Sequence, residues 1–249
     1  MSETTDAPRD PDQPFQIRSG DVNWPRAVIA VVAAGVILAL SIALAAVTTL
    51  EVVSRVPTLS EVQAEVLIIT LMQVFSVVLC VLVVSAHKRW RSALLLNIPQ
   101  GQRRSVIPGI VAVSAFILGV CTVLAVVFLP EMLRRDISPF FPLIESDVWW
   151  VAVLAVVVGA PISEEILFRG FLVRELTQAQ VGFGWAAGIA NVMWTAAHFN
   201  YSIVGLSFVF LAGVLFSWAL YRTGSVWVTI AMHALYNIVA LIVMVTVFR

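Results

Sequence analysis

The chain has 249 residues, of which 60% are hydrophobic and only 12% are charged. Soluble globular proteins carry about 25% charged residues, so this composition argues against an ordinary soluble domain and predicts a chain that lies mostly in a lipid bilayer. The formal net charge is zero, so the charge balance gives no indication of a nucleic-acid partner.

Residues 1–26 are polar and rich in Asp, Pro and Thr, which predicts a disordered tail. Uncharged runs follow at residues 27–50, 66–86 and 105–130, each long enough to cross the hydrocarbon core. Ser60 and Gln63, like Thr58 and Glu61, have the spacing of a capping box just before the second run.

A fourth apolar run begins near Ser146 and passes through an acidic pair at positions 164 and 165. The uncharged stretch 176–221 is too long for one helix, and the break at 200–202 divides it in two. Residues 223–248 form the last run. The sequence therefore predicts an all-α, polytopic transmembrane bundle of about seven spans, with its active site in a membrane-embedded cavity.

The distribution of basic residues predicts the orientation. With the N-terminus inside, the inner segments carry eleven Lys and Arg residues and the outer segments carry four. Because basic residues accumulate on the cytoplasmic side, we expect a multi-pass protein of the cell membrane with a cytoplasmic N-terminus. We expect N-terminal transmembrane helices over 27–140 and a catalytic transmembrane region over 145–249.

Ionisable groups at membrane depth are costly and are kept for a function. The first such cluster contains Glu164, Glu165 and Arg169. Glu165 and Arg169 are four residues apart and share a helix face, so they can form an ion pair. Glu164 is rotated by about 100° and is left free for chemistry. A charge cluster at a helix end is the alternative interpretation.

Two further clusters pair an aromatic or amide side chain with histidine. Trp194 precedes His198 by four residues, and His233 precedes Asn237 by four, so each pair lies on one helix face. A single membrane histidine often makes only a structural hydrogen bond. Two histidines, an unpaired Glu and an Asn on three helices are the groups that water activation and oxyanion stabilisation require.

In this order, Glu-Glu-x-x-x-Arg, aromatic-x-x-x-His and His-x-x-x-Asn resemble the CAAX protease and bacteriocin-processing family of intramembrane endopeptidases. The resemblance covers roughly residues 145–245 and implies that Glu164 and His198 activate water while His233 and Asn237 hold the oxyanion. Glu165 and Arg169 would be a supporting ion pair. The family's aromatic residue is usually Phe, whereas this chain has Trp194.

The resemblance leaves the cofactor open. The family is commonly named as metalloprotease, and a zinc ion, if present, would be held by Glu164, His198 and His233. Asn is a poor zinc ligand, however, and the chain has no His-Glu-x-x-His helix. The preferred hypothesis is metal-free chemistry at a Glu base.

The implied substrate is a membrane-anchored peptide or protein, whether prenylated or not. Two alternatives remain: a non-catalytic, immunity-type membrane protein, and a proton-coupled transporter. A depth problem also arises, because His198 ends its span while His233 lies early in its own. We expect the turn at 200–202 to lie below the membrane surface and to line a watery cavity.

Overall fold

The computed structural model describes residue 15, residues 21–85 and residues 90–249. All regular structure in these ranges is helical, as predicted. The long elements before residue 140 are α1 (Trp24–Arg55), α2 (Glu61–Ser85) and α5 (Ile107–Phe128). Short helices connect them: α3 (Trp90–Ala93), α4 (Gly101–Ser105), α6 (Pro130–Ile137), η1 (Ser138–Phe140) and α7 (Phe141–Ile144).

The second half begins with one continuous helix over Trp149–Gln178. It consists of α8 (Trp149–Leu154), η2 (Ala155–Gly159), α9 (Ala160–Glu165), η3 (Ile166–Leu172) and α10 (Val173–Gln178), of which η2 and η3 are π-helical. Then come α11 (Phe183–Ala197), α12 (Ile203–Thr223) and α13 (Val226–Val247). The predicted division near residues 200–202 is confirmed.

Two helix starts differ from the predicted boundaries for local reasons. The Asn23 side chain accepts a hydrogen bond from the Arg26 N–H at 3.1 Å, and Pro25 occupies the first turn. The helix therefore begins at Trp24, and the last three residues of the predicted 1–26 tail belong to it. Most of that tail lies outside the described residues. Before α2, Ser60 and Gln63 exchange hydrogen bonds of 3.0 and 3.2 Å, so the predicted capping box at these two residues is formed.

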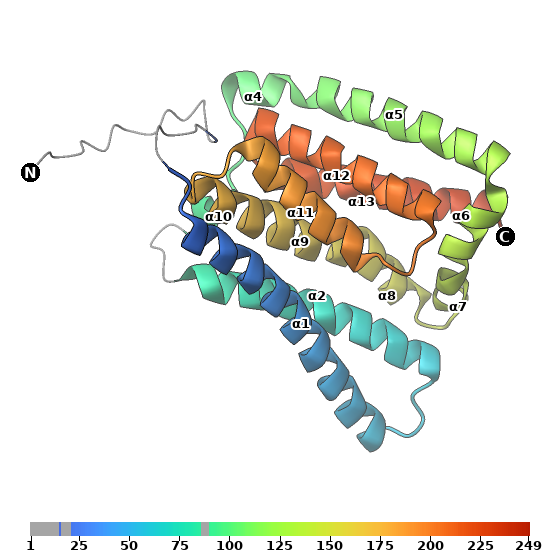
Figure 1. The fold of residues 1–249 in the computed structure, drawn as a ribbon. Coiled ribbons are helices and arrows are strands. Elements are labelled where there is room, and N and C mark those ends of the chain that lie inside the picture. The colour runs from blue at the N-terminus through green and yellow to red at the C-terminus, as the bar shows by residue number, and fades with distance from the viewer. Residues whose placement is uncertain (1–14, 16–20, 86–89) are drawn as a thin grey trace, which may run out of the picture.

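The long helices lie side by side, with α5 at one edge of the bundle, α1 at the other and α9 to α11 between them (Figure 1). Among the described residues, six helices are long and apolar enough to cross a membrane. The chain is therefore a multi-pass membrane protein. The remaining candidate, α11, has 15 residues and a length of about 22 Å, against about 30 Å for the hydrocarbon core. The predicted count of seven spans stays a prediction.

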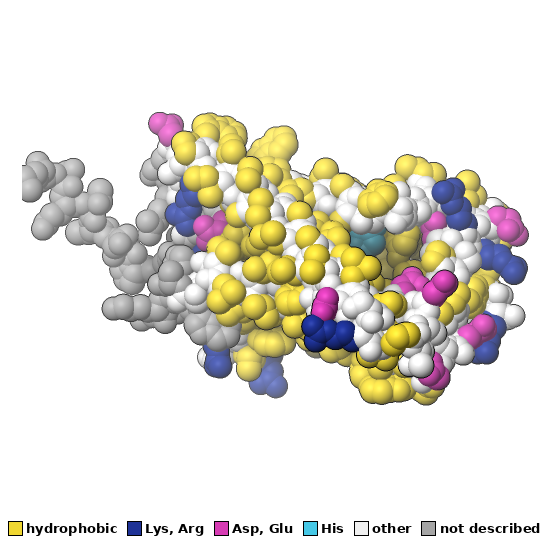
Figure 2. Space-filling model, turned by 90° about the horizontal axis from the view of Figure 1, so that it is seen from below, with side chains coloured by type: hydrophobic (Ala, Val, Ile, Leu, Met, Phe, Trp, Pro, Cys, Tyr) yellow, Lys and Arg dark blue, Asp and Glu magenta, His cyan; other side chains and the backbone are white. Residues whose placement is uncertain are grey.

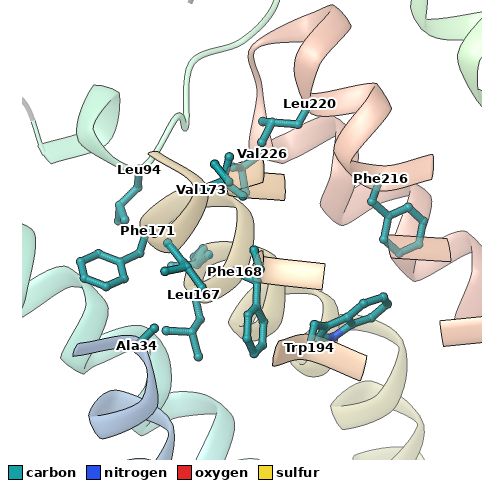
Figure 3. Packing of buried hydrophobic residues seen from close by; sticks show 14 of the residues in the cluster. Ala34, Leu94, Leu167, Phe168, Phe171, Val173, Trp194, Phe216, Leu220 and Val226 are labelled. Atoms are coloured by element: carbon teal, nitrogen blue, oxygen red, sulfur yellow. The ribbon is translucent and has the colours of Figure 1, made fainter. Parts of the chain in front are cut away.

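The core is centred on the π-helical segment η3. All seven of its residues are buried, and its apolar side chains include Leu167, Phe168 and Phe171. Figure 3 shows these side chains directed toward different neighbours, with Phe168 next to Trp194 of α11. The helix that carries Glu164 is thus surrounded on several sides, and this packing holds its side chains in fixed positions.

Candidate active site

The ion pair expected of Glu165 and Arg169 is present and fully enclosed. Arg169 Nη1 donates to Glu165 Oε1 at 3.1 Å, and both side chains have zero exposure. Arg169 Nη2 also reaches the Gly213 carbonyl oxygen of α12 at 3.4 Å. A buried guanidinium is tolerated only when it is paired in this way, so these contacts fix α9, η3 and α12 together.

Arg169 also packs against aromatic rings. Its central guanidinium carbon lies 4.4 Å from the centre of the Trp194 ring and 5.7 Å from that of Phe216. Such cation–π contacts are stronger away from water. The buried cation thereby holds the Trp194 ring in one orientation.

Glu164 points away from the ion pair, as the rotation of the helix predicts. Its side chain keeps 25% exposure, while that of Glu165 keeps none. Glu164 Oε2 accepts a hydrogen bond of 2.5 Å from the Trp194 indole Nε1. The sequence pattern predicts only an aromatic ring at position 194, but the indole also donates a hydrogen bond, which a Phe ring cannot provide.

His233 stands between the two acidic side chains. Its Nδ1 is 3.0 Å from Glu165 Oε1, and its Nε2 is 4.0 Å from Glu164 Oε2. A carboxylate next to Arg169 only accepts hydrogen bonds, so the His233 Nδ1 carries the proton. The Nε2 therefore faces Glu164. The ring is 4% exposed and stacks on Phe216 with centroids 5.2 Å apart.

His198 also lies against the Trp194 ring. It forms the C-cap of α11, and its ring centroid is 5.4 Å from that of Trp194, the same separation as between Trp194 and His233. The His198 Nδ1 is 2.9 Å from the Trp194 carbonyl oxygen, which can only accept. The Nε2 of His198 is therefore left available as an acceptor or base.

Asn237 is held elsewhere. Its Nδ2 donates to the Val156 carbonyl oxygen of η2 at 2.8 Å. That carbonyl lacks an ordinary helical donor, because Ala160 N–H bonds Ala155 O and Pro161 has no N–H. Among the described residues, Glu164, His198 and His233 gather around Trp194, whereas the Asn237 side chain bonds the backbone of η2. An amide nitrogen carries two hydrogens, so the second remains for other partners.

Residues that the sequence did not single out support the loop after α11. Asp136 of α6 is buried, and its carboxylate accepts hydrogen bonds of 2.6 Å from both the backbone N–H and the hydroxyl of Ser202. The Ser202 hydroxyl accepts in turn from the Gly205 N–H at 3.2 Å and caps α12. The loop that follows His198 is thereby tied to α6.

Tyr201 in this loop lies beside His198, with ring centroids 5.4 Å apart. Burial, followed by the nearby charges of Glu164 and Asp136, raises the pKa of Tyr201. The phenol therefore stays protonated and is a hydrogen-bond donor at the edge of the site. Nothing in its spacing distinguished it from other aromatic residues.

The site is reachable from outside. Figure 2 shows a histidine side chain inside a hollow of the molecular surface, between hydrophobic walls. Glu164 and His198 are partly exposed, whereas Glu165, Arg169 and Trp194 are buried. An exposed side and a buried side are therefore separated within one cluster.

The three predicted zinc ligands, Glu164, His198 and His233, do not form a metal-binding group in the described part of the structure. Within the described part of the chain, no group of three His, Cys, Asp or Glu side chains is arranged to hold a metal ion.

Comparison with known proteins finds related sequences. An Escherichia coli protein described as "Uncharacterized 24.3 kDa protein" is 28% identical over 162 residues, which are 62% of this chain and 70% of the relative. No solved structure matches the chain. Residues 146–239 match the family model "Type II CAAX prenyl endopeptidase Rce1-like". This range contains every residue of the cluster around Trp194. This region of the chain is therefore similar to the Rce1-like family of type II CAAX prenyl endopeptidases.

Proposed function

We propose that the chain hydrolyses a peptide bond of a membrane-anchored substrate, and that Glu164 and His198 activate the attacking water. The observation that carries this is the Glu164 carboxylate, which is oriented by the Trp194 N–H at 2.5 Å and partly exposed. A general base must be fixed in direction yet open to substrate and water. The family match supports peptide hydrolysis as the reaction class.

In the proposed reaction, Glu164 takes a proton from water as the water oxygen bonds to the peptide carbonyl carbon. His198 offers its free Nε2 to the same water. The C–N bond then breaks, and the proton held by Glu164 passes to the leaving amine. Atoms and charge balance without an added reactant.

The oxyanion formed in the first step needs donors. His233 in its protonated form offers the Nε2 hydrogen, on the side that faces Glu164. The second amide hydrogen of Asn237 is the other proposed donor. Donors about 3 Å from the oxyanion position, held before the reaction starts, supply a large part of the rate enhancement at such sites.

The substrate is proposed to be prenylated at a C-terminal CAAX sequence, as the family description suggests. The cytoplasmic N-terminus and metal-free chemistry also belong to this proposal. Activity retained in a strong chelator would support the metal-free mechanism, and activity lost in chelator but restored by zinc would contradict it.

The decisive experiment uses Glu164→Gln in the full chain, reconstituted in lipid vesicles with a quenched fluorescent, farnesylated CAAX peptide. The variant keeps the shape of the side chain but removes the base, so turnover should be abolished while peptide binding persists. Glu175→Gln is the matched control, because Glu175 lies on the same continuous helix and pairs with Arg26 at 3.0 Å, outside the cluster. Equal activity of both variants would refute the mechanism.

A further inference from the structure

Gln73 is a buried amide on α2, a helix that is otherwise largely apolar. Its residue exposure is 6%, and its Nε2 donates to the Ala155 carbonyl oxygen at 3.1 Å. Burying an amide in apolar surroundings is costly unless it is hydrogen-bonded. The partner of Gln73 lies on the continuous helix that carries Glu164, and Gln73 itself lies outside the region that matches the family.

The backbone that Gln73 contacts is not an ordinary α-helical turn. In η2 the Ala160 N–H donates to Ala155 O, five residues back instead of four. A π-turn of this kind accommodates one extra residue and is intrinsically rare. Gln73 bonds the Ala155 carbonyl from α2, and Asn237 bonds the Val156 carbonyl from α13. Two amide side chains therefore hold successive carbonyls of one turn.

Gly159 provides the room for this contact. A Cβ at Gly159 would overlap the Gln73 side-chain oxygen. Because the Gln73 side chain packs directly against Gly159, the position of α2 depends on the geometry of the turn.

The turn controls the direction of the groups that follow it. Each residue rotates a helix by about 100°. If η2 relaxed to α-helical geometry, the extra residue would be absorbed and the following residues would rotate by about that angle. Glu164, five residues after Gly159, would then leave the Trp194 N–H.

We propose that Gln73 is a positioning residue for Glu164 and acts by holding the π-turn η2. The proposal rests on the proposed function only in taking Glu164 as the catalytic base. Because Gln73 reaches η2 from α2, the N-terminal half of the chain contributes, through this turn, to the geometry of the active site.

The test compares Gln73→Met with Thr70→Val in the full chain. Met keeps the length of Gln without its amide. Thr70 lies one turn away on α2, and its hydroxyl bonds only its own helix at Val66 O, 2.8 Å away. Two quantities are measured in vesicles: turnover of the farnesylated peptide, and the labelling rate of Glu164 by dicyclohexylcarbodiimide, followed by mass spectrometry.

In Gln73→Met we expect kcat to fall roughly 100-fold at unchanged KM, as a displacement of about 1 Å can cause. Glu164 labelling should rise roughly tenfold, as expected when a charge-assisted hydrogen bond is lost. Thr70→Val should change neither quantity. A Gln73→Met protein with reduced thermal stability but unchanged labelling and kcat would overturn the proposal and make Gln73 purely structural.

The labelling measurement does not depend on peptidase activity. If the wild-type chain fails to cleave the peptide, the proposed function fails. A rise in Glu164 labelling in Gln73→Met would then still support the positioning of Glu164, and unchanged labelling would refute it.

Discussion

The Trp194 indole N–H donates to Glu164 at 2.5 Å, and the Arg169 guanidinium lies 4.4 Å from the centre of the same ring. A buried cation thus orients an aromatic donor, which orients a partly exposed carboxylate. Replacing any one of the three should affect the others.

The substitution Trp194→Phe should test the indole hydrogen bond. Phe keeps an aromatic ring next to Arg169 but removes the donor to Glu164. We expect kcat to fall roughly tenfold, the equivalent of about 1.4 kcal/mol, with little loss of thermal stability. Activity equal to that of the wild type would mean that position 194 contributes only packing.

Arg169→Ala should strongly reduce the amount of folded protein. Removing one partner of a buried ion pair leaves an uncompensated charge and costs about 3–5 kcal/mol. The control is Arg55→Ala, which breaks the ion pair with Glu51 at the same i, i+4 spacing but at an exposed helix end. That change should cost less than about 1 kcal/mol. Normal detergent stability of Arg169→Ala together with abolished activity would instead assign Arg169 to the chemistry.

Gly213→Ala should destabilise the site from the α12 side. A Cβ at Gly213 would overlap the Asn191 amide oxygen and lie 2.9 Å from Arg169 Nη2. Overpacking of this kind costs about 1–3 kcal/mol. Gly188→Ala on α11 is the matched control, because a Cβ there meets nothing within 4 Å, and helix propensity should make it neutral or slightly stabilising. Thermal melting of both variants in detergent checks this, and equal melting temperatures would contradict it.

Asn237→Ala distinguishes two roles of the amide. If Asn237 donates to the oxyanion, kcat should fall roughly 100- to 1000-fold. If it serves only the Val156 carbonyl, the main effect should be a lower melting temperature. Steady-state kinetics and melting measured on the same preparation separate the two, and a melting shift with kcat within a few-fold of the wild type would remove Asn237 from the reaction.

Asp136→Ala should loosen the loop after His198. It removes two hydrogen bonds to Ser202 made by a buried carboxylate, and each such bond contributes about 1.5–3 kcal/mol. We expect lower thermal stability and faster hydrogen exchange at residues 198–203. Asp147→Ala, which removes an exposed bond to Gln63, should leave both quantities nearly unchanged.

The sequence predicted the parts of the site that follow from helix periodicity and from the cost of polar groups in lipid. The Glu165–Arg169 pair, the outward turn of Glu164 and the break after His198 all follow from spacing. It did not predict contacts between distant segments, such as Asp136 with Ser202. Gln73 and Asn191 carried a usable signal, since each is an amide in an uncharged run, but their partners are backbone carbonyls, which have no sequence pattern.

The π-turns lay beyond prediction for a different reason. Pro161 indicates a disturbed helix, yet the disturbance could have been a kink, a break or a bulge. The choice depends on amides from α2 and α13 that bond the Ala155 and Val156 carbonyls. Tertiary packing therefore decides the local backbone geometry here.

The shortness of α11 has a consequence for the lipid around the protein. If α11 is the seventh span, its length falls about 8 Å short of the hydrocarbon core and creates a hydrophobic mismatch, which a bilayer relieves by thinning next to the helix. Thinning on this side would bring headgroups and water toward the end of α11, where His198 caps the helix. Acyl chain length would then regulate hydration of the site, and thin membranes would suit this protein better than thick ones.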